Sequence, residues 1–185
     1  MKRFVWILCL LMLLSGCTAQ RDDLDRVLAL RTKLLSQGAE FNAVITADYS
    51  DKTYTFGVHC IADVQGRLTF AVLSPDTIAG IAGTVSANGG KLTFDEQALA
   101  FPTLADGQLT PVAAPWVLIN TLRSGYLTSA GAEGDSLRVA IDDSYADNAL
   151  HLDIWLDAND LPVQCEIFWK GRRILSVEVK DFHFV

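Results

Sequence analysis

The clearest chemistry in this sequence is at Cys17, which follows the small and apolar residues 14–16. A basic start, Lys2 and Arg3, precedes an apolar run over residues 4–14. A positive end, a short apolar core and small residues are typical of a secretory signal that is cut at a defined position. The cut would fall just before Cys17. A membrane-spanning helix is an alternative, but the run is shorter than the roughly 20 residues that a bilayer requires.

The segment 14–17, Leu-Ser-Gly-Cys, resembles a bacterial lipobox. The resemblance implies that residues 1–16 are a lipoprotein signal peptide and that Cys17 carries acyl chains such as palmitate. Acyl chains hold a protein on a bilayer more durably than a charged surface does. We therefore expect a lipid-anchored protein on the extracytoplasmic side of a cell membrane or envelope, with residues 17–21 as the lipidated cysteine and a short tether. Cleavage without lipidation is the alternative.

The composition of the mature chain is acidic. Removal of residues 1–16 leaves 169 residues with 13 Lys and Arg against 22 Asp and Glu, a net charge of −9. This charge argues against a nucleic-acid partner, which requires a basic surface, and against electrostatic attachment to anionic lipid. The length suits one domain, residues 22–185, with enough buried surface for a real core.

The remaining candidate catalytic and metal-binding residues form no recognisable pattern. The histidines, His59, His151 and His183, lie on separate predicted strands and share no helical metal-ligand spacing. The acidic segment 142–148 lacks the spacing of an EF-hand loop, which favours a solvated turn. The sequence contains no nucleophile elbow, phosphate loop or dinucleotide fingerprint. It therefore predicts no enzyme activity, no cofactor and no metal.

Two cysteines remain in the mature chain besides Cys17. In an oxidising compartment Cys60 and Cys165 are a possible disulfide. The alternative is two buried thiols that pack like small apolar groups. The sequence leaves both open, because it does not give the distance between them.

The hydrophobic periodicity predicts two helices and a meandering sheet. Helices are expected at 22–37, ended by Gly38, and at 114–127, with Pro115 in the first turn. The period of two predicts several strands: 41–49, 54–64, 68–72, 83–87, 91–95, 97–101, 150–157, 163–169 and a last strand after Gly171. Residues 65–67 are expected to form a hairpin loop, and residues 102–112 a longer loop.

The expected hairpin loops also predict which residues pair. Ala43 is expected opposite Cys60, and Cys60 opposite Val72. A two-residue loop at 159–160 places Ile154 opposite Cys165. Further pairs expected from that loop are Leu156 with Val163, Leu152 with Ile167, Leu150 with Trp169 and, as a like-charge pair on the other face, Asp153 with Glu166. The apolar phase slips near 180–181, which predicts a β-bulge there.

Several segments together resemble the LolA/LolB lipoprotein-carrier superfamily, which includes germination lipoproteins such as GerS. They are the helix before long strands, the segment from 74–76 to Gly83 before a Gly-rich hairpin, the turn at 157–162 and the closing strand at 177–184. The resemblance implies an α+β fold: a strongly curved antiparallel sheet, an incomplete β-barrel of about 9–11 strands, with helices covering its concave face.

The resemblance also implies a ligand on that concave face. The residues expected to line it are Phe56, Val58, Phe70, Val72, Trp116, Leu122, Leu152, Ile154, Ile167 and Val177. One interpretation is a lipoprotein that binds a lipid or other apolar ligand there. The alternative is a non-catalytic protein-interaction lipoprotein that scaffolds or activates a cell-wall enzyme, with an envelope protein as its partner. A third possibility is that these residues simply form a packed core.

Overall fold

The computed structural model describes residues 16–86, 91–93 and 102–185. The predicted strand at 97–101 and residues 1–15 of the predicted signal peptide lie outside this description. The described helices are α2 (Gly16–Ser36) and α3 (Ala114–Ser124), with 3₁₀ turns η1 (Ala105–Gly107) and η2 (Pro111–Ala113). The described strands are β1 (Ala39–Asp48), β2 (Thr53–Ala62), β3 (Leu68–Ser74), β4 (Ala82–Val85), β5 (Lys91–Thr93), β6 (Tyr126–Glu133), β7 (Ser136–Asp142), β8 (His151–Leu156), β9 (Pro162–Trp169) and β10 (Arg172–Phe184).

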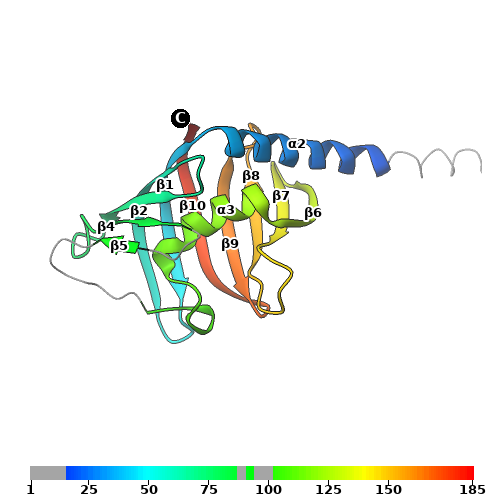
Figure 1. The fold of residues 1–185 in the computed structure, drawn as a ribbon. Coiled ribbons are helices and arrows are strands. Elements are labelled where there is room, and N and C mark those ends of the chain that lie inside the picture. Colours follow the sequence, from blue (N-terminus) through cyan, green and yellow to red (C-terminus); the bar gives the residue numbers. More distant parts are fainter. Residues whose placement is uncertain (1–15, 87–90, 94–101) are drawn as a thin grey trace, which may run out of the picture.

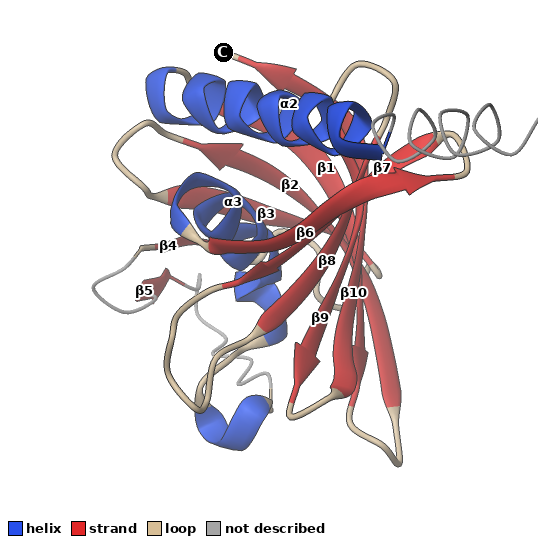
Figure 2. Cartoon of the chain, turned by 90° about the vertical axis from the view of Figure 1, so that its right-hand side faces the viewer, coloured by secondary structure: helices blue, strands red, loops and turns tan. Residues whose placement is uncertain are grey.

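The ten described strands form one antiparallel sheet in the order β5-β4-β3-β2-β1-β10-β9-β8-β7-β6. Most neighbours in the sheet are neighbours in sequence, but β1 pairs with β10 and so joins the two halves of the chain. β5 and β6 stand at opposite ends of the order, so this sheet is open. The sheet twists strongly and bends around α3, while α2 lies across one end of it (Figures 1 and 2). The predicted α+β fold class is confirmed.

One face of the sheet carries the hydrophobic core. Along β1 every second residue, from Ala39 through Phe41 to Ala47, is buried, and the residues between them are only partly covered. This alternation places the apolar residues on a single face. The helix α3 covers that face and contacts β2, β7 and β10, which are not neighbours in the sheet.

The helix α2 is longer than the sequence predicted. It begins at Gly16 rather than at residue 22, so the residues expected as a tether form its first turns. Its buried stripe consists of Val27, Leu30 and Leu34, at the spacing of one helical face. Neither described helix has both the length and the apolarity needed to cross a membrane.

The predicted faces of β1, β2 and β3 are correct, but the predicted register is displaced by two residues. Cys60 lies opposite Phe41 on β1 and opposite Phe70 on β3, rather than opposite Ala43 and Val72. A displacement of two residues leaves every side chain on its own face, because the side-chain period of a strand is two. The Asp63 N–H donates to the Arg67 carbonyl at 2.9 Å, so the hairpin loop lies at 64–66 rather than at 65–67. Gly66 in this loop takes a left-handed φ of 84°.

The hairpin of β8 and β9 has the predicted pairs Ile154–Cys165 and Leu152–Ile167. Its loop has three residues instead of two, because the Asp157 N–H donates to the Leu161 carbonyl at 2.9 Å. Asp160 takes the left-handed position at a φ of 62°. This longer loop pairs Leu156 with Pro162, so the predicted pair of Leu156 and Val163 was wrong.

The predicted opposition of Asp153 and Glu166 is also present. Arginines on the flanking strands offset the repulsion between the two carboxylates. Arg138 Nη2 on β7 donates to Asp153 Oδ2 at 2.7 Å, and Arg173 on β10 pairs with Glu166. This pairing raises the pKa of the Arg138 guanidinium, chiefly through the hydrogen bond to Asp153.

The predicted bulge near 180–181 is confirmed. Asn42 pairs with Lys180 but Glu40 pairs with His183, so β10 contains one extra residue here. Asp181 adopts a φ of 56°, which turns the chain at the bulge. As a result Val179 and Phe182, three residues apart, both reach the core.

Two strands, β6 and β7, were not predicted. The helix α3 was expected to reach residue 127 but ends at Ser124, where Gly125 is extended with a ψ of 167°. A Cβ atom at Gly125 would lie 2.6 Å from the Ile141 side chain and 2.7 Å from the Thr121 carbonyl oxygen. Only glycine allows this close approach, and it directs the chain into β6 at the edge of the sheet.

Candidate binding site

The ten residues predicted to line a lumen lie together on the inner face of the sheet and on α3. All of them except Trp116 are buried in one continuous apolar cluster, against which Trp116 packs. Val58, Leu152, Ile154, Ile167 and Val177 are 0% exposed. Protein atoms therefore surround these five side chains, and a ligand could contact them only after neighbouring side chains moved aside.

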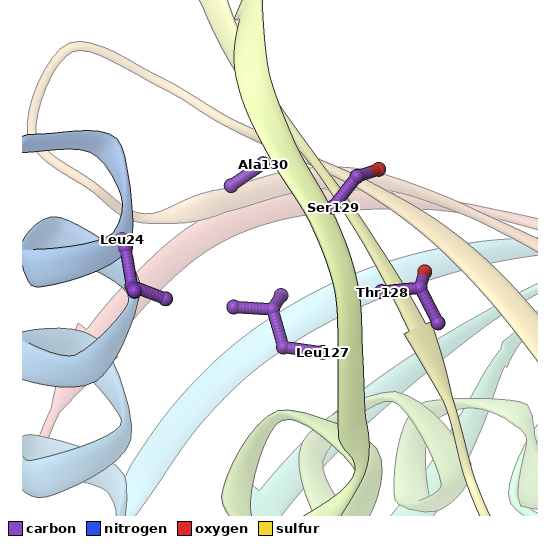
Figure 3. A pocket seen from close by; sticks show the side chains of 5 residues that line it. All are labelled: Leu24, Leu127, Thr128, Ser129 and Ala130. Carbon is purple, nitrogen blue, oxygen red and sulfur yellow. The ribbon is translucent and has the colours of Figure 1, made fainter. Parts of the chain in front are cut away.

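A pocket occurs elsewhere, between α2 and the edge strand β6. It has a volume of about 200 Å³ and is lined by Leu24, Leu127, Thr128, Ser129 and Ala130. Figure 3 shows Leu24 extending from α2 toward Leu127 and Ala130 on β6. The Thr128 hydroxyl donates to the Ala140 carbonyl at 2.9 Å, so this polar group is already satisfied by β7. The apolar lining of the pocket therefore comes from Leu24, Leu127 and Ala130, and Ser129 contributes a further hydroxyl.

Apolar side chains on α2 continue beyond the pocket. Leu24, Leu28 and Leu35 are 38%, 44% and 56% exposed. Their spacing of four and seven residues places them along one side of the helix. This exposed stripe is distinct from the buried stripe of Val27, Leu30 and Leu34, so α2 has apolar surface that the domain itself does not cover.

Two arginines fix α2 against α3. Arg31 on α2 donates to the carbonyls of Leu122 and Gly125 at 2.8 and 2.9 Å, and Arg123 on α3 donates to the Leu34 carbonyl at 2.9 Å. Each guanidinium satisfies carbonyls near the C-terminus of the other helix, where the helix dipole favours positive charge. Burial lowers the pKa of both guanidinium groups, and Asp63 partly offsets this for Arg123.

Further contacts hold the two helices to the sheet. Arg26 on α2 donates to Asp160 in the turn of β8 and β9 at 2.7 Å. The Trp116 indole N–H on α3 donates to the Gly66 carbonyl in the turn of β2 and β3 at 2.9 Å. These contacts join α2 and α3 to turns that are far apart in sequence.

Cys60 and Cys165 are both free thiols, and both are buried. Cys60 on β2 and Cys165 on β9 are separated by the strands β1 and β10. At about 4.8 Å per strand, this separation exceeds the reach of a disulfide. Burial raises the pKa of both thiols. Cys60 and Cys165 are therefore two buried thiols, as in the second of the two predicted alternatives, and they form no disulfide with each other.

The acidic segment 142–148 stabilises the connection between β7 and β8. The Asp143 carboxylate accepts the Leu150 N–H at 2.9 Å, and Asp142 pairs with His151 at 2.7 Å. The pocket was not predicted because its strand β6 was not predicted. The alternation of Leu137, Val139 and Ile141 was a usable signal for β7, and from it for a hairpin partner.

Comparisons with known proteins show likenesses of fold only. No protein-family model and no curated protein matches the chain. A LolA superfamily protein from Nitrosomonas europaea is similar at a TM-score of 0.46 and 10% identity, over 86% of this chain and 93% of that one. MucB is similar at a TM-score of 0.47 and 14% identity, over 91% of this chain and 59% of that one. A chain of the MucA/MucB complex from Pseudomonas aeruginosa is similar at a TM-score of 0.41 and 12% identity, over 88% of this chain and 56% of that one.

Proposed function

We propose that this chain is a non-catalytic envelope lipoprotein, anchored through Cys17, that binds an apolar group such as a lipid acyl chain between α2 and β6. The observation that carries the proposal is the pocket between α2 and β6, in which Leu24, Leu127 and Ala130 form an apolar wall beside Thr128 and Ser129. Burying such surface against an acyl chain is favourable by roughly 25 cal/mol per Å² of apolar area.

The position of the pocket along α2 supports a ligand taken from the membrane. Because α2 is continuous from Gly16 to Ser36, Cys17 lies seven residues before Leu24 on the same helix. Seven residues correspond to about 10 Å along the helix axis. Acyl chains attached at Cys17 would therefore hold the pocket close to the bilayer surface, and a lipid chain would have a short path to it.

The size of the pocket limits what it accepts. A volume of about 200 Å³ is smaller than the roughly 300–1,000 Å³ typical of sites that enclose a whole small molecule. It therefore suits a segment of one acyl chain, with the remainder lying beside Leu28 on the exposed side of α2.

The test compares two substitutions on the same helix. A fluorescent fatty-acyl probe is titrated into the wild-type protein, a Leu24→Asp variant and a Leu35→Asp variant. A carboxylate at Leu24 would be desolvated against the probe, so we expect at least tenfold weaker binding for that variant. Leu35→Asp is the matched control, because Leu35 is exposed and does not line the pocket. Equal affinities for all three proteins would contradict the proposal.

A partner protein is the second candidate occupant, and β6 is the observation that favours it. Among the described strands β6 pairs only with β7, which leaves one edge of this eight-residue strand open within that part of the chain. Extended peptides add to such edges through backbone hydrogen bonds, and lysine on an edge opposes strand addition. A Gly131→Lys variant should lose an envelope partner while retaining the acyl probe, since a side chain at Gly131 enters open space.

A further inference from the structure

The exposed side of α2 and the start of β6 carry large apolar and aromatic side chains that the described part of the domain leaves uncovered. Leu28 and Leu35 on α2 are 44% and 56% exposed, and Tyr126 on β6 is 39% exposed. Tyr145, between β7 and β8, is 82% exposed, and its ring centroid lies 3.5 Å from that of Tyr126. We call these four residues the α2–tyrosine surface. A group of exposed apolar side chains marks an interaction surface, whereas single ones are ordinary.

A hydrogen bond joins the leucines of this surface to its tyrosines. Arg31 follows Leu28 by three residues and precedes Leu35 by four, so it is a neighbour of both on the surface of α2. Arg31 Nη2 donates to the Gly125 carbonyl at 2.9 Å. Gly125 directly precedes Tyr126, and α2 and β6 lie side by side (Figure 2). The tyrosine pair therefore begins next to the exposed leucines.

The charge of α2 differs from that of the rest of the mature chain. Residues 16–36 contain four Lys and Arg residues against three Asp residues, a net charge of +1. The remainder of the mature chain contains 9 Lys and Arg residues against 19 Asp and Glu residues, a net charge of −10. Negative charge is repelled by the negative surface potential of a membrane that contains anionic lipid. The helix α2 can therefore approach a bilayer without the repulsion that acts on the rest of the domain.

The place of Cys17 on the same helix indicates what covers this surface, and here the argument rests on the anchor that the proposed function assumes. Cys17 precedes Leu28 by eleven residues and Leu35 by eighteen, which is about three and five whole turns, so the three positions lie on one side of α2. The two leucines lie about 16 and 27 Å from Cys17 along the helix axis. A helix standing upright on the membrane would hold Leu35 away from lipid, whereas a helix lying in the membrane plane brings both leucines to it.

We propose that the α2–tyrosine surface lies on the lipid bilayer, with α2 parallel to the membrane plane and the leucines at the boundary of headgroups and acyl chains. Amphipathic helices bind membranes in this orientation, and tyrosine is enriched at the membrane–water interface. The contact depends on burial of apolar groups rather than on charge, so salt leaves it unchanged. Leu24 lies on the same side of α2, so the wall of the pocket that it forms stands next to the bilayer.

The experiment uses the lipoprotein with its acyl anchor, reconstituted into vesicles of phosphatidylcholine, a lipid without net charge. An environment-sensitive fluorophore is attached to a new thiol, either Leu35→Cys or Tyr145→Cys. Cys60 and Cys165 are buried and so are expected to remain unlabelled in the folded protein. We expect blue-shifted emission from both labels and about twofold quenching by phosphatidylcholine that is brominated on its acyl chains. Both effects should be the same at low and high salt.

Leu73→Cys supplies the matched control. Leu73 is 54% exposed, close to the value for Leu35, but it lies on β3, in the other half of the strand order from β6. A label there should emit as in water and should not be quenched. Leu35→Asp should remove the quenching of a label at Tyr145→Cys, because a carboxylate resists transfer from water into the interface. The same Leu35→Asp variant should retain the acyl probe, so membrane contact and pocket binding are measured separately.

Three results would overturn this inference alone, in protein that floats with the vesicles. They are no quenching at Leu35→Cys and Tyr145→Cys, equal quenching at Leu73→Cys, and blue-shifted emission that brominated lipid does not quench. The last result would assign the surface to a second copy of the chain or to another protein. Protein that does not float with the vesicles would refute the anchor at Cys17 and, with it, both proposals. Failure to bind the acyl probe would refute only the pocket.

Discussion

Replacement of Leu34 by alanine tests whether α2 is a packed part of the domain. Leu34 is 0% exposed on the buried stripe of α2, whereas its neighbour Leu35 is 56% exposed. Truncating a buried leucine loses its transfer free energy and leaves a cavity, which together cost roughly 2–5 kcal/mol. We expect Leu34→Ala to lower the free energy of unfolding by about 3 kcal/mol, and Leu35→Ala by less than about 0.5 kcal/mol. Both changes place alanine at adjacent positions of one helix, so helix propensity largely cancels between them.

The assay is urea unfolding of residues 18–185, followed by circular dichroism. In a domain of this length, a loss of about 3 kcal/mol corresponds to a fall in Tm of roughly 6–12 °C. The slope of the unfolding free energy against urea concentration should be the same for both variants, since the surface exposed on unfolding barely changes. If Leu34→Ala cost no more than Leu35→Ala, α2 would not be packed on α3 and the pocket at Leu24 would have no fixed wall.

Three further predictions concern the core, the thiols and a turn. Ile154→Trp should overpack the filled sheet interior and destabilise the protein by about 1–3 kcal/mol, without changing acyl-probe affinity. Loss of the probe in a folded variant would instead place the ligand in the interior. Cys60 and Cys165 should resist alkylation at about pH 8 until urea unfolds the chain, because burial raises their pKa values. Burial by itself would raise the pKa of Asp63, but hydrogen bonds from Arg67 and Gln65 outweigh it and lower that pKa. This carboxylate therefore stabilises the fold above its unfolded pKa of about 3.9, and the contribution is lost as the pH falls through the lower folded value. Asp63→Asn should cost roughly 1 kcal/mol at neutral pH, and the difference from wild type, measured by urea unfolding across pH, should narrow in acid.

Local patterns in the sequence predicted the fold where the signal was strong. The alternation through Leu152 and Ile154 and its return through Cys165 and Ile167 gave two correct cross-strand pairs. The slip in phase before Phe182 gave the bulge. Loop length was harder, because two- and three-residue turns at 158–160 both satisfy the same apolar pattern. The predicted partners of Cys60 were wrong by two residues for the same reason. A shift of two residues keeps every side chain on its own face, so the apolar pattern fits both registers.

The candidate sites depended on contacts between distant segments. Leu24 and Leu127 are about 100 positions apart in sequence, and only the packing of α2 beside β6 brings them together. The arginine contacts that hold α2 in place also join distant residues, as Arg31 does with the Gly125 carbonyl. Neither periodicity nor spacing along the chain contains this information, because both describe one element at a time.

The sequence by itself determined which residues face the core, because the period of a strand or helix is a local property of the backbone. It also determined the signal-like start, the acidic surface and the separation of His59 and His183 onto different strands. Only the tertiary structure decided that β1 lies between β2 and β10, and so that Glu40 stands between those two histidines. The physical reason is that the strand order is the one that buries the apolar face of the whole sheet. That burial depends on every helix and strand that packs against the face.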